Sequence, residues 1–147
     1  LDNDLAEGRY RVGGKPVAIA DIEVPMFIVG TVRDHVAPWP SVYKMHLLSD
    51  AELTFVLTSG GHNAGVVSEP RHPRRSYQIA TRSTGARYVD PQTWRDETPL
   101  NDGSWWPAWQ QWLARRSAGR VTPPAMFGMH GVYAPLGDAP GTYVAMK

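Results

Sequence analysis

An acidic residue and a histidine each follow an apolar run in this sequence. Asp34 comes just after PMFIVGT, and His62 follows LTFVLTS through a pair of glycines. Because the carboxyl ends of parallel strands meet at one edge of a sheet, neighbouring strands would deliver both side chains to the same place. A carboxylate that binds one imidazole nitrogen leaves the other nitrogen free to accept a proton. The spacing therefore predicts an Asp34–His62 dyad capable of acid–base catalysis.

Each residue of the dyad also has a simpler structural explanation. Asp34 alone is typical of an Asx turn, in which the carboxylate accepts hydrogen bonds from backbone N–H groups of the next residues. His62 alone is typical of a structural histidine in a loop. Their joint placement after two strands favours the dyad. His35 sits beside Asp34 but is expected to point elsewhere, in a structural or supporting role.

The elements that must position the dyad form one strand–helix–strand unit. Both apolar runs are short and rich in β-branched and aromatic residues, as in strands buried on both faces. Between them, WPSVYKMHLLSD (39–50) carries apolar residues at near-helical spacing. This connection is long enough for a right-handed crossover, so the two strands are expected to be parallel neighbours. The predicted fold class is α/β, with a mostly parallel sheet that looks unfinished because only one such unit is recognisable.

The remaining segments predict smaller elements around this unit. RYRV and KPVAI, joined by two glycines, predict a hairpin with strands at about 9–12 and 15–19. The polar stretch after His62 predicts an ordered excursion with one or two short strands, at YQIA and ARYV. The chain thus divides into five parts: a hairpin and connector (1–23), the strand–helix–strand unit (24–67), a polar excursion (68–104), a Trp-rich helix (105–119) and an irregular tail (120–147).

The segment GSWWPAWQQWLARRS predicts a helix with tryptophans along one face. Trp105, Trp109 and Trp112 follow the spacing i, i+4 and i+7. Such a stripe favours a packing face over a platform that stacks on a ligand.

Composition excludes several classes of function. The 147 residues carry 15 Lys and Arg against 14 Asp and Glu, so the net charge of +1 creates no general field for nucleic acid or an anionic membrane. Without cysteine, these residues cannot form disulfides, thiolate metal sites or a cysteine nucleophile. The histidines show no metal-ligand spacing, so no metal site is expected. No apolar stretch is long enough to span a bilayer, which favours a soluble, cytoplasmic protein.

A catalytic dyad of this kind needs a nucleophile, and none is found at the expected place. In α/β-hydrolases, a G-x-nucleophile-x-G elbow between a strand and a helix lies upstream of the acid and the histidine. No such elbow precedes Asp34, and Ser59 in TSGGHNAG ends the strand that already delivers the histidine. The nucleophile is therefore expected upstream of Leu1, in a longer protein of which this chain is a piece.

Five segments, in their order along the chain, resemble the C-terminal part of polyhydroxyalkanoate synthases: VPMFIVGTVRDHVAPW, FVLTSGGHNAGVV, PRRSY, GSWWPAWQQWL and APGTYV. The resemblance covers about Val24 to Val144, and the RVGGKPV hairpin also fits. It implies an incomplete, C-terminal portion of an α/β-hydrolase fold. It also implies an acyltransferase that polymerises (R)-3-hydroxyacyl-CoA into polyester and releases CoA.

The resemblance implies roles for the dyad as well. In that family a cysteine carries the growing ester as a thioester. His62 matches the histidine that activates this cysteine. Asp34 matches the catalytic aspartate, which either orients the histidine or helps to activate the 3-hydroxyl group of the substrate. Because this chain has no cysteine, it is expected to be inactive alone.

The partners implied by the resemblance are the acyl-CoA, the growing polyester, a second copy in a homodimer of the complete enzyme, and the surface of a polymer granule. No cofactor, nucleic acid or membrane span is expected. Arg74 and Arg75, in a basic cluster with Arg71 and His72, are candidates for binding the phosphates of CoA. A solvated charged face is the simpler explanation of such a run.

Two other classes of protein remain open on the residues alone. One is a different α/β-hydrolase, such as an esterase or a dehalogenase, with a serine or aspartate nucleophile upstream. The other is a non-catalytic domain whose tryptophan helix docks on a granule or a partner. A contiguous exposed patch formed by Trp105, Trp109 and Trp112 would indicate such a docking module.

Overall fold

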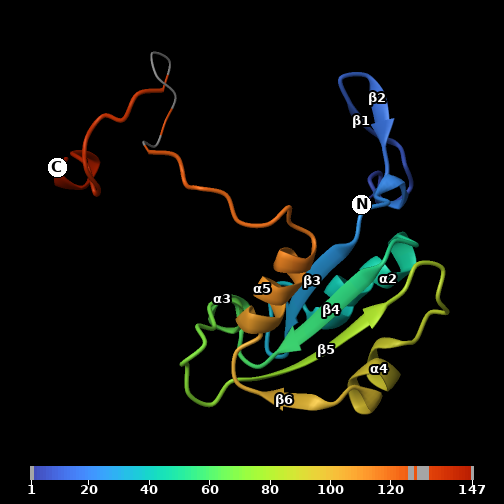
Figure 1. Ribbon diagram of the computed structural model, residues 1–147. Coiled ribbons are helices and arrows are strands. Elements are labelled where there is room, and N and C mark those ends of the chain that lie inside the picture. The colour runs from blue at the N-terminus through green and yellow to red at the C-terminus, as the bar shows by residue number, and fades with distance from the viewer. Residues whose placement is uncertain (1, 126–127, 129–132, 147) are drawn as a thin grey trace. The chain divides into compact units, whose positions relative to one another are not determined.

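The computed structural model of this chain describes residues 2–125, 128 and 133–146 (Figure 1). The chain divides into two units, Leu1–Arg116 and Ser117–Lys147. The first unit contains the sheets and both residues of the predicted dyad. In the second unit, the described residues include one short 3₁₀ helix, Tyr143–Ala145. Within the described parts of the chain, no helix has the length and apolar character needed to cross a membrane.

Four strands form the main sheet, in the order β3-β4-β5-β6. They are β3 (Met26–Thr31), β4 (Leu53–Thr58), β5 (Ser76–Arg82) and β6 (Leu100–Asp102). β3 and β4 are parallel, as the sequence predicts, and Thr31 at the end of β3 lies opposite Thr58 at the end of β4. β5 is antiparallel to β4, and β6 is antiparallel to β5. The sheet is thus mixed, parallel at the pair that carries the dyad and antiparallel beyond it.

Two short helices join β3 to β4. They are α1 (Trp39–Tyr43) and α2 (Met45–Leu48), separated by Lys44. The N–H of Lys44 binds the carbonyl of Ser41, three residues back, which interrupts the α-helical ladder at this point. The helix predicted over 39–50 is therefore present but broken in two.

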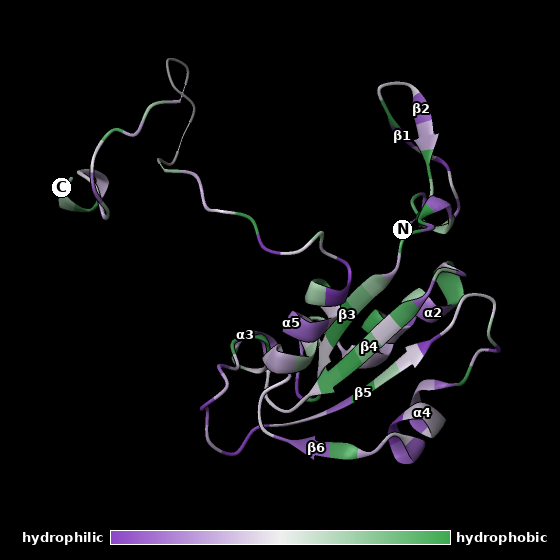
Figure 2. Ribbon diagram, viewed as in Figure 1, coloured by the Kyte–Doolittle hydropathy of each residue, from purple (hydrophilic) through white to green (hydrophobic). Residues whose placement is uncertain are grey.

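The main core lies between one face of the sheet and two helices, α1 and α4 (Pro91–Glu97). Side chains alternate between the faces of a strand, so alternate residues of β4 enter this core: Leu53, Phe55 and Leu57. The Phe55 ring meets Tyr43 of α1 edge-on, with 5.0 Å between centroids, and Trp94 of α4 at 5.1 Å. Figure 2 shows mostly hydrophobic residues along β3 and β4, in agreement with this burial.

Helix α5 (Trp106–Arg115) covers the other face of the sheet (Figure 1). Phe27 of β3 contacts Trp105, just before the helix, and Trp112 within it, with ring centroids 6.1 and 5.6 Å apart. Trp105 is 5% exposed, whereas Trp109 is 41% exposed. The tryptophan stripe is therefore mainly a packing face, and it lacks the contiguous exposed patch of a docking module. The helix ends at Arg115 and is therefore shorter than the predicted segment 105–119.

The polar excursion (68–104) holds more regular structure than its composition predicts. β5 includes the predicted strand YQIA, but the prediction of a strand at ARYV (86–89) is wrong, and α4 and β6 are additional elements. Helix α4 starts at an Asp-Pro sequence. The Asp90 carboxylate accepts hydrogen bonds from the N–H groups of Gln92 and Thr93, and Pro91 occupies the first turn. This cap is what allows a helix to begin within a polar segment.

The N-terminal hairpin forms as the sequence predicts. β1 (Tyr10–Val12) is antiparallel to β2 (Lys15–Val17). Gly13 and Gly14 have φ angles of +56° and +78°, as required by a two-residue turn between strands. The second strand is shorter than predicted, because a 3₁₀ helix, Ile19–Asp21, follows it.

Phe55→Ala is expected to destabilise the first unit by about 3–5 kcal/mol, because it leaves a cavity where a ring packs against Tyr43 and Trp94. Phe55 is fully buried, whereas Leu100 in β6 is 67% exposed. Leu100→Ala should therefore change the free energy of unfolding by less than about 0.5 kcal/mol. Denaturant unfolding, followed by tryptophan fluorescence, measures both variants. Equal costs at the two positions would contradict this placement of the core.

Candidate active site

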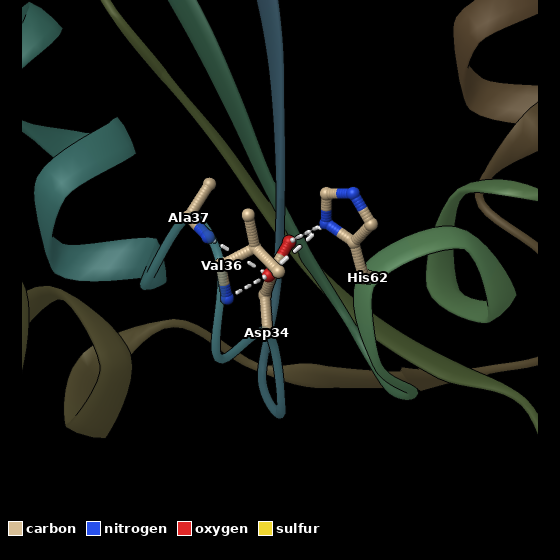
Figure 3. A network of polar contacts seen from close by, with 4 residues as sticks. All are labelled: Asp34, Val36, Ala37 and His62. Atoms are coloured by element: carbon tan, nitrogen blue, oxygen red, sulfur yellow. Dashed lines mark hydrogen bonds and ion pairs between the residues drawn. The ribbon is translucent and has the colours of Figure 1, made fainter.

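Asp34 and His62 are hydrogen-bonded to each other at the carboxyl ends of β3 and β4. Nδ1 of His62 lies 3.1 Å from Oδ1 and 2.9 Å from Oδ2 of Asp34 (Figure 3). Asp34 belongs to the loop after β3, and His62 is the first residue of α3 (His62–Val66), which follows β4. Because the two parallel strands end in register, their loops begin side by side. The structure therefore brings together the two side chains of the predicted dyad.

The Asp34 carboxylate also closes an Asx turn. Its Oδ1 accepts hydrogen bonds from the backbone N–H groups of Val36, at 2.8 Å, and Ala37, at 2.9 Å (Figure 3). Asp34 thus has both of the roles that the sequence suggests, because it closes a turn and also bonds to His62. The turn fixes the carboxylate, and the fixed carboxylate meets the imidazole. The Asp34 side chain is 9% exposed and that of His62 is 48% exposed, so the imidazole is accessible from solvent.

These hydrogen bonds lower the pKa of Asp34. The N–H of Ala37, then the bond from His62 and the N–H of Val36, hold the pKa of Asp34 down at about 2, although its partial desolvation opposes them. At neutral pH the group is a carboxylate, which can only accept hydrogen bonds. Nδ1 of His62 therefore carries the hydrogen in this pair. In the neutral imidazole, Nε2 is left with a free lone pair, on the side of the ring away from Asp34 (Figure 3).

Two glycines give His62 its place beside the end of β3. Gly60 has a φ of +115°, and a Cβ on it would lie 2.9 Å from the backbone of Gly65. A Cβ on Gly65 would lie 2.5 Å from Cγ2 of Thr31, the last residue of β3. Side chains at either position would push α3 away from the strand. Glycine at positions 60 and 65 is therefore a requirement of close packing at the site.

The segment 104–106 supports α3 from the other side, a function that sequence analysis missed. The indole Nε1–H of Trp105 donates to the carbonyl of Gly65 at 3.2 Å, and that of Trp106 donates to Val66 at 3.0 Å. The Ser104 hydroxyl donates to the carbonyl of Ser68. The available signal in the sequence was the hydrogen-bond donors of the motif GSWW, namely the Ser104 hydroxyl and the two indole N–H groups.

The two arginines predicted to bind the phosphates of CoA differ in their exposure and contacts. Arg74 is exposed, with a φ of +57°. Arg75 is half-buried; its Nη2 lies 3.2 Å from Nε2 of His72, and its Nη1 lies 3.0 Å from where a Cβ of Gly60 would be. Arg75 thus lies against the turn that leads to His62, whereas Arg74 faces outward. His35 is exposed in the Asp34 loop.

A cavity of about 270 Å³ adjoins the loops of the dyad. Its polar lining consists of two arginines and three neutral side chains: Arg33, Arg95, Ser59, Ser76 and Gln78. Arg33 directly precedes Asp34, so the cavity brings cationic groups to the same end of the sheet. Across the described part of the chain, no group of three or more His, Asp or Glu side chains could hold a metal ion.

The chain is similar in sequence to curated poly(3-hydroxyalkanoate) polymerases. It is 35% identical to poly(3-hydroxyalkanoate) polymerase 2 of Ectopseudomonas oleovorans over 136 residues, which cover 92% of this chain and 23% of that protein. It is 37% identical to the poly(3-hydroxyalkanoate) polymerase subunit PhaC of Cupriavidus necator over 148 residues, covering 100% of this chain and 24% of that protein. The poly(3-hydroxyalkanoate) polymerase of Methylorubrum extorquens is 36% identical, with the same two coverages. No family model matches the chain.

These relatives are all poly(3-hydroxyalkanoate) polymerases, and the similarity extends over the whole of this chain. The chain is related to part of the poly(3-hydroxyalkanoate) polymerases, which confirms the resemblance to polyhydroxyalkanoate synthases. It spans about a quarter of the length of these curated relatives.

The Asp34 carboxyl is expected to titrate with a midpoint near pH 2, as measured by NMR of its side-chain carbon. Because this pKa is depressed below the ordinary 3.8, the contribution of Asp34 to stability is present above about pH 4 and is lost as the pH falls through about 2. His62→Ala should raise the midpoint but leave it below 3.8, because the N–H groups of Ala37 and Val36 remain. A midpoint that did not move in His62→Ala would contradict the hydrogen bond between the two side chains.

Proposed function

We propose that this chain is the C-terminal part of the catalytic domain of a poly(3-hydroxyalkanoate) polymerase. In this proposal Asp34 and His62 form the base of its acyl-transfer site. The observation that carries the proposal is the hydrogen bond of His62 Nδ1 to a fixed carboxylate, which leaves Nε2 available. The similarity of the whole chain to polymerases supplies the reaction class. The substrate is (R)-3-hydroxyacyl-CoA, and the products are polyester and CoA.

The chemistry needs a cysteine from a segment of the polymerase outside this chain. Nε2 of His62 takes the proton of the thiol, and the thiolate attacks the thioester carbonyl of the acyl-CoA. The carbon–sulfur bond to CoA breaks, and the imidazolium returns the proton to the departing CoA sulfur. The acyl group is then held as a thioester on the enzyme. This chain has no cysteine, so alone it should be inactive.

The same histidine can serve the ester-forming step. It takes the proton of a 3-hydroxyl group as the hydroxyl oxygen attacks the enzyme thioester. The new carbon–oxygen bond lengthens the polyester, and the cysteine sulfur, as the leaving group, recovers the proton. One imidazole with a free Nε2 can therefore support both halves of the cycle.

The environment of Asp34 favours an orienting role over direct activation of the hydroxyl. Oδ1 accepts from two backbone N–H groups, and both oxygens lie within hydrogen-bond distance of His62. A carboxylate with a pKa of about 2 is a weak base for a hydroxyl proton. Asp34 is better suited to hold the tautomer of His62 and to stabilise its imidazolium.

The complete sheet should extend beyond β3. This strand stands at one end of the strand order, paired with β4 on one side. An α/β-hydrolase fold would place further strands of the polymerase along the other edge of β3, together with the elbow that carries the cysteine. In this proposal, one catalytic domain includes all five parts of the chain: 1–23, 24–67, 68–104, 105–119 and 120–147. A homodimer and attachment to a polymer granule are proposed from the resemblance alone.

The two rival functions have less support. A docking module would need its tryptophans exposed, and Trp105 and Trp112 pack against Phe27 instead. A different α/β-hydrolase would use the same dyad, but the whole-chain similarity is to polymerases. The polymerase is therefore the function that the observations support best.

In the complete polymerase, His62→Ala is expected to abolish CoA release from 3-hydroxybutyryl-CoA, because the thiol loses its base. Asp34→Asn should reduce kcat by about 10⁴-fold, because an amide facing Nδ1 favours the wrong tautomer. Thiol release, followed with a disulfide reagent, measures both variants. The control is Asp96→Asn, an exposed carboxylate on α4, which should retain activity. Rapid CoA release by His62→Ala, with a normal circular dichroism spectrum, would overturn the assignment.

Charge reversal tests the proposed phosphate site. Arg74→Glu together with Arg75→Glu is expected to raise the KM for the acyl-CoA about tenfold or more, because charge-assisted hydrogen bonds are lost. Arg74→Glu alone, on an exposed side chain, separates this effect from any disturbance of the Gly60 turn by Arg75. Arg120→Glu, an exposed arginine of the second unit, is the control. If KM stays unchanged in the double variant, the arginines form a solvated face.

A further inference from the structure

The helix that carries His62 is too short to be stable by itself. α3 has five residues, and the backbone bonds at its two ends run from Gly65 N to Gly61 O, at 2.8 Å, and from Val67 N to Asn63 O, at 3.0 Å. An isolated helix of about one turn is unfavourable in water, because its nucleation fixes many dihedral angles for few hydrogen bonds. The position of His62 must therefore depend on contacts from outside the helix.

Those contacts come from the three consecutive residues Ser104, Trp105 and Trp106. The last carbonyls of a helix have no partner within the helix. Here the indole N–H groups of Trp105 and Trp106 donate to the carbonyls of Gly65 and Val66. Ser104 donates to the next loop carbonyl, that of Ser68, which is fully buried. The end of α3 is thus held by side chains that lie about 40 residues further along the chain.

The three donors are themselves firmly placed. The Ser104 oxygen accepts the backbone N–H of Trp106 at 3.0 Å, so one hydroxyl joins the start of α5 to the loop after α3. Trp105 stacks on Phe27 of β3, with an angle of 28° between the ring planes. β3 leads directly to the loop of Asp34. The segment therefore connects the helix of His62 to the strand that positions Asp34.

The close approach of Gly65 to Thr31 gives α3 a second contact with the same strand. The Cγ2 atom of Thr31 leaves no room for a side chain on Gly65. With the carbonyl of Gly65 bound to Trp105 on one side and its Cα against Thr31 on the other, α3 is fixed in two directions. A small displacement of this turn would change the distance between Nδ1 of His62 and the Asp34 carboxylate.

We propose that Ser104, Trp105 and Trp106 are positioning residues, which hold α3 so that His62 Nδ1 stays in hydrogen-bond contact with Asp34. This inference rests on the proposed function, since it assigns catalytic consequence to that contact. The two indoles act through hydrogen bonds to the backbone of α3. Displacements of about 1 Å at a reacting group can cost about 100-fold in rate.

Three matched variants of the complete polymerase test the proposal: Trp105→Phe, Trp106→Phe and Trp112→Phe. Each keeps an aromatic ring and removes one indole N–H. The Trp112 indole nitrogen is buried without a hydrogen-bond partner in the described structure. Trp112→Phe is therefore the control for loss of ring volume alone. Thermal unfolding midpoints show whether each variant is folded. If Trp105→Phe fails to fold, the half-buried Trp106 still provides the test.

Trp106→Phe and Trp105→Phe are expected to lower kcat about tenfold or more, while the KM for acyl-CoA stays within about twofold. The downfield proton resonance of His62 Nδ1, identified by its loss in His62→Ala, should shift or broaden in both variants. Trp112→Phe should change neither quantity. A merely structural role would lower the unfolding midpoint without moving this resonance in the folded enzyme.

Two results would overturn the proposal. One is an unchanged kcat and Nδ1 resonance in both Trp105→Phe and Trp106→Phe. The other is an equal loss in Trp112→Phe, which would assign the effect to ring packing. Failure of the proposed function would look different, since His62→Ala would then retain activity. The Nδ1 resonance would still report whether the indoles hold the imidazole against Asp34.

Discussion

The hydrogen bond between Asp34 and His62 depends on one constraint, the in-register parallel pairing of β3 and β4. Because both strands end at the same level, the loops that follow them start side by side. A slip of one residue in this register would turn the side chains of one strand to the opposite face. The aromatic core around Phe55 supports the register from one side, and the stacking of Phe27 on Trp105 supports it from the other. The packing on both faces of the sheet thus supports these two strand ends.

The support is of two kinds, one local and one distant. Locally, the Asx turn of Asp34 and the glycines of the His62 loop set the backbone, so that the two side chains face each other. The N–H groups of the Asx turn also lower the pKa of Asp34. Because the carboxylate can only accept hydrogen bonds, the hydrogen of this pair lies on Nδ1 of His62. The second kind comes from residues distant in sequence, because the indoles of Trp105 and Trp106 bind the end of α3. Each contact removes one way in which the imidazole could turn away from the carboxylate.

The sequence predicted the dyad because its signals are local. Apolar runs, a crossover of suitable length and polar residues just after each run are enough to place both side chains at one edge. The hairpin was also predictable, because two glycines at a tight turn have a direct conformational cause. The support from Trp105 and Trp106 was missed because tryptophan spacing indicates packing, whereas a hydrogen bond to a helix end depends on tertiary structure. The prediction at ARYV failed for a similar reason: β-forming residues made no strand there, and the cap at Asp90 began a helix just beyond.

The measurement that tests the account most directly is a structure of the complete polymerase in which we propose that this chain lies. The account predicts a cysteine on a strand-to-helix elbow, with its Sγ atom within about 3–4 Å of His62 Nε2, and with Nδ1 still bound to Asp34. A cysteine well beyond hydrogen-bond reach, with another base beside it, would contradict the account. So would an elbow residue near Nε2 that is not a cysteine.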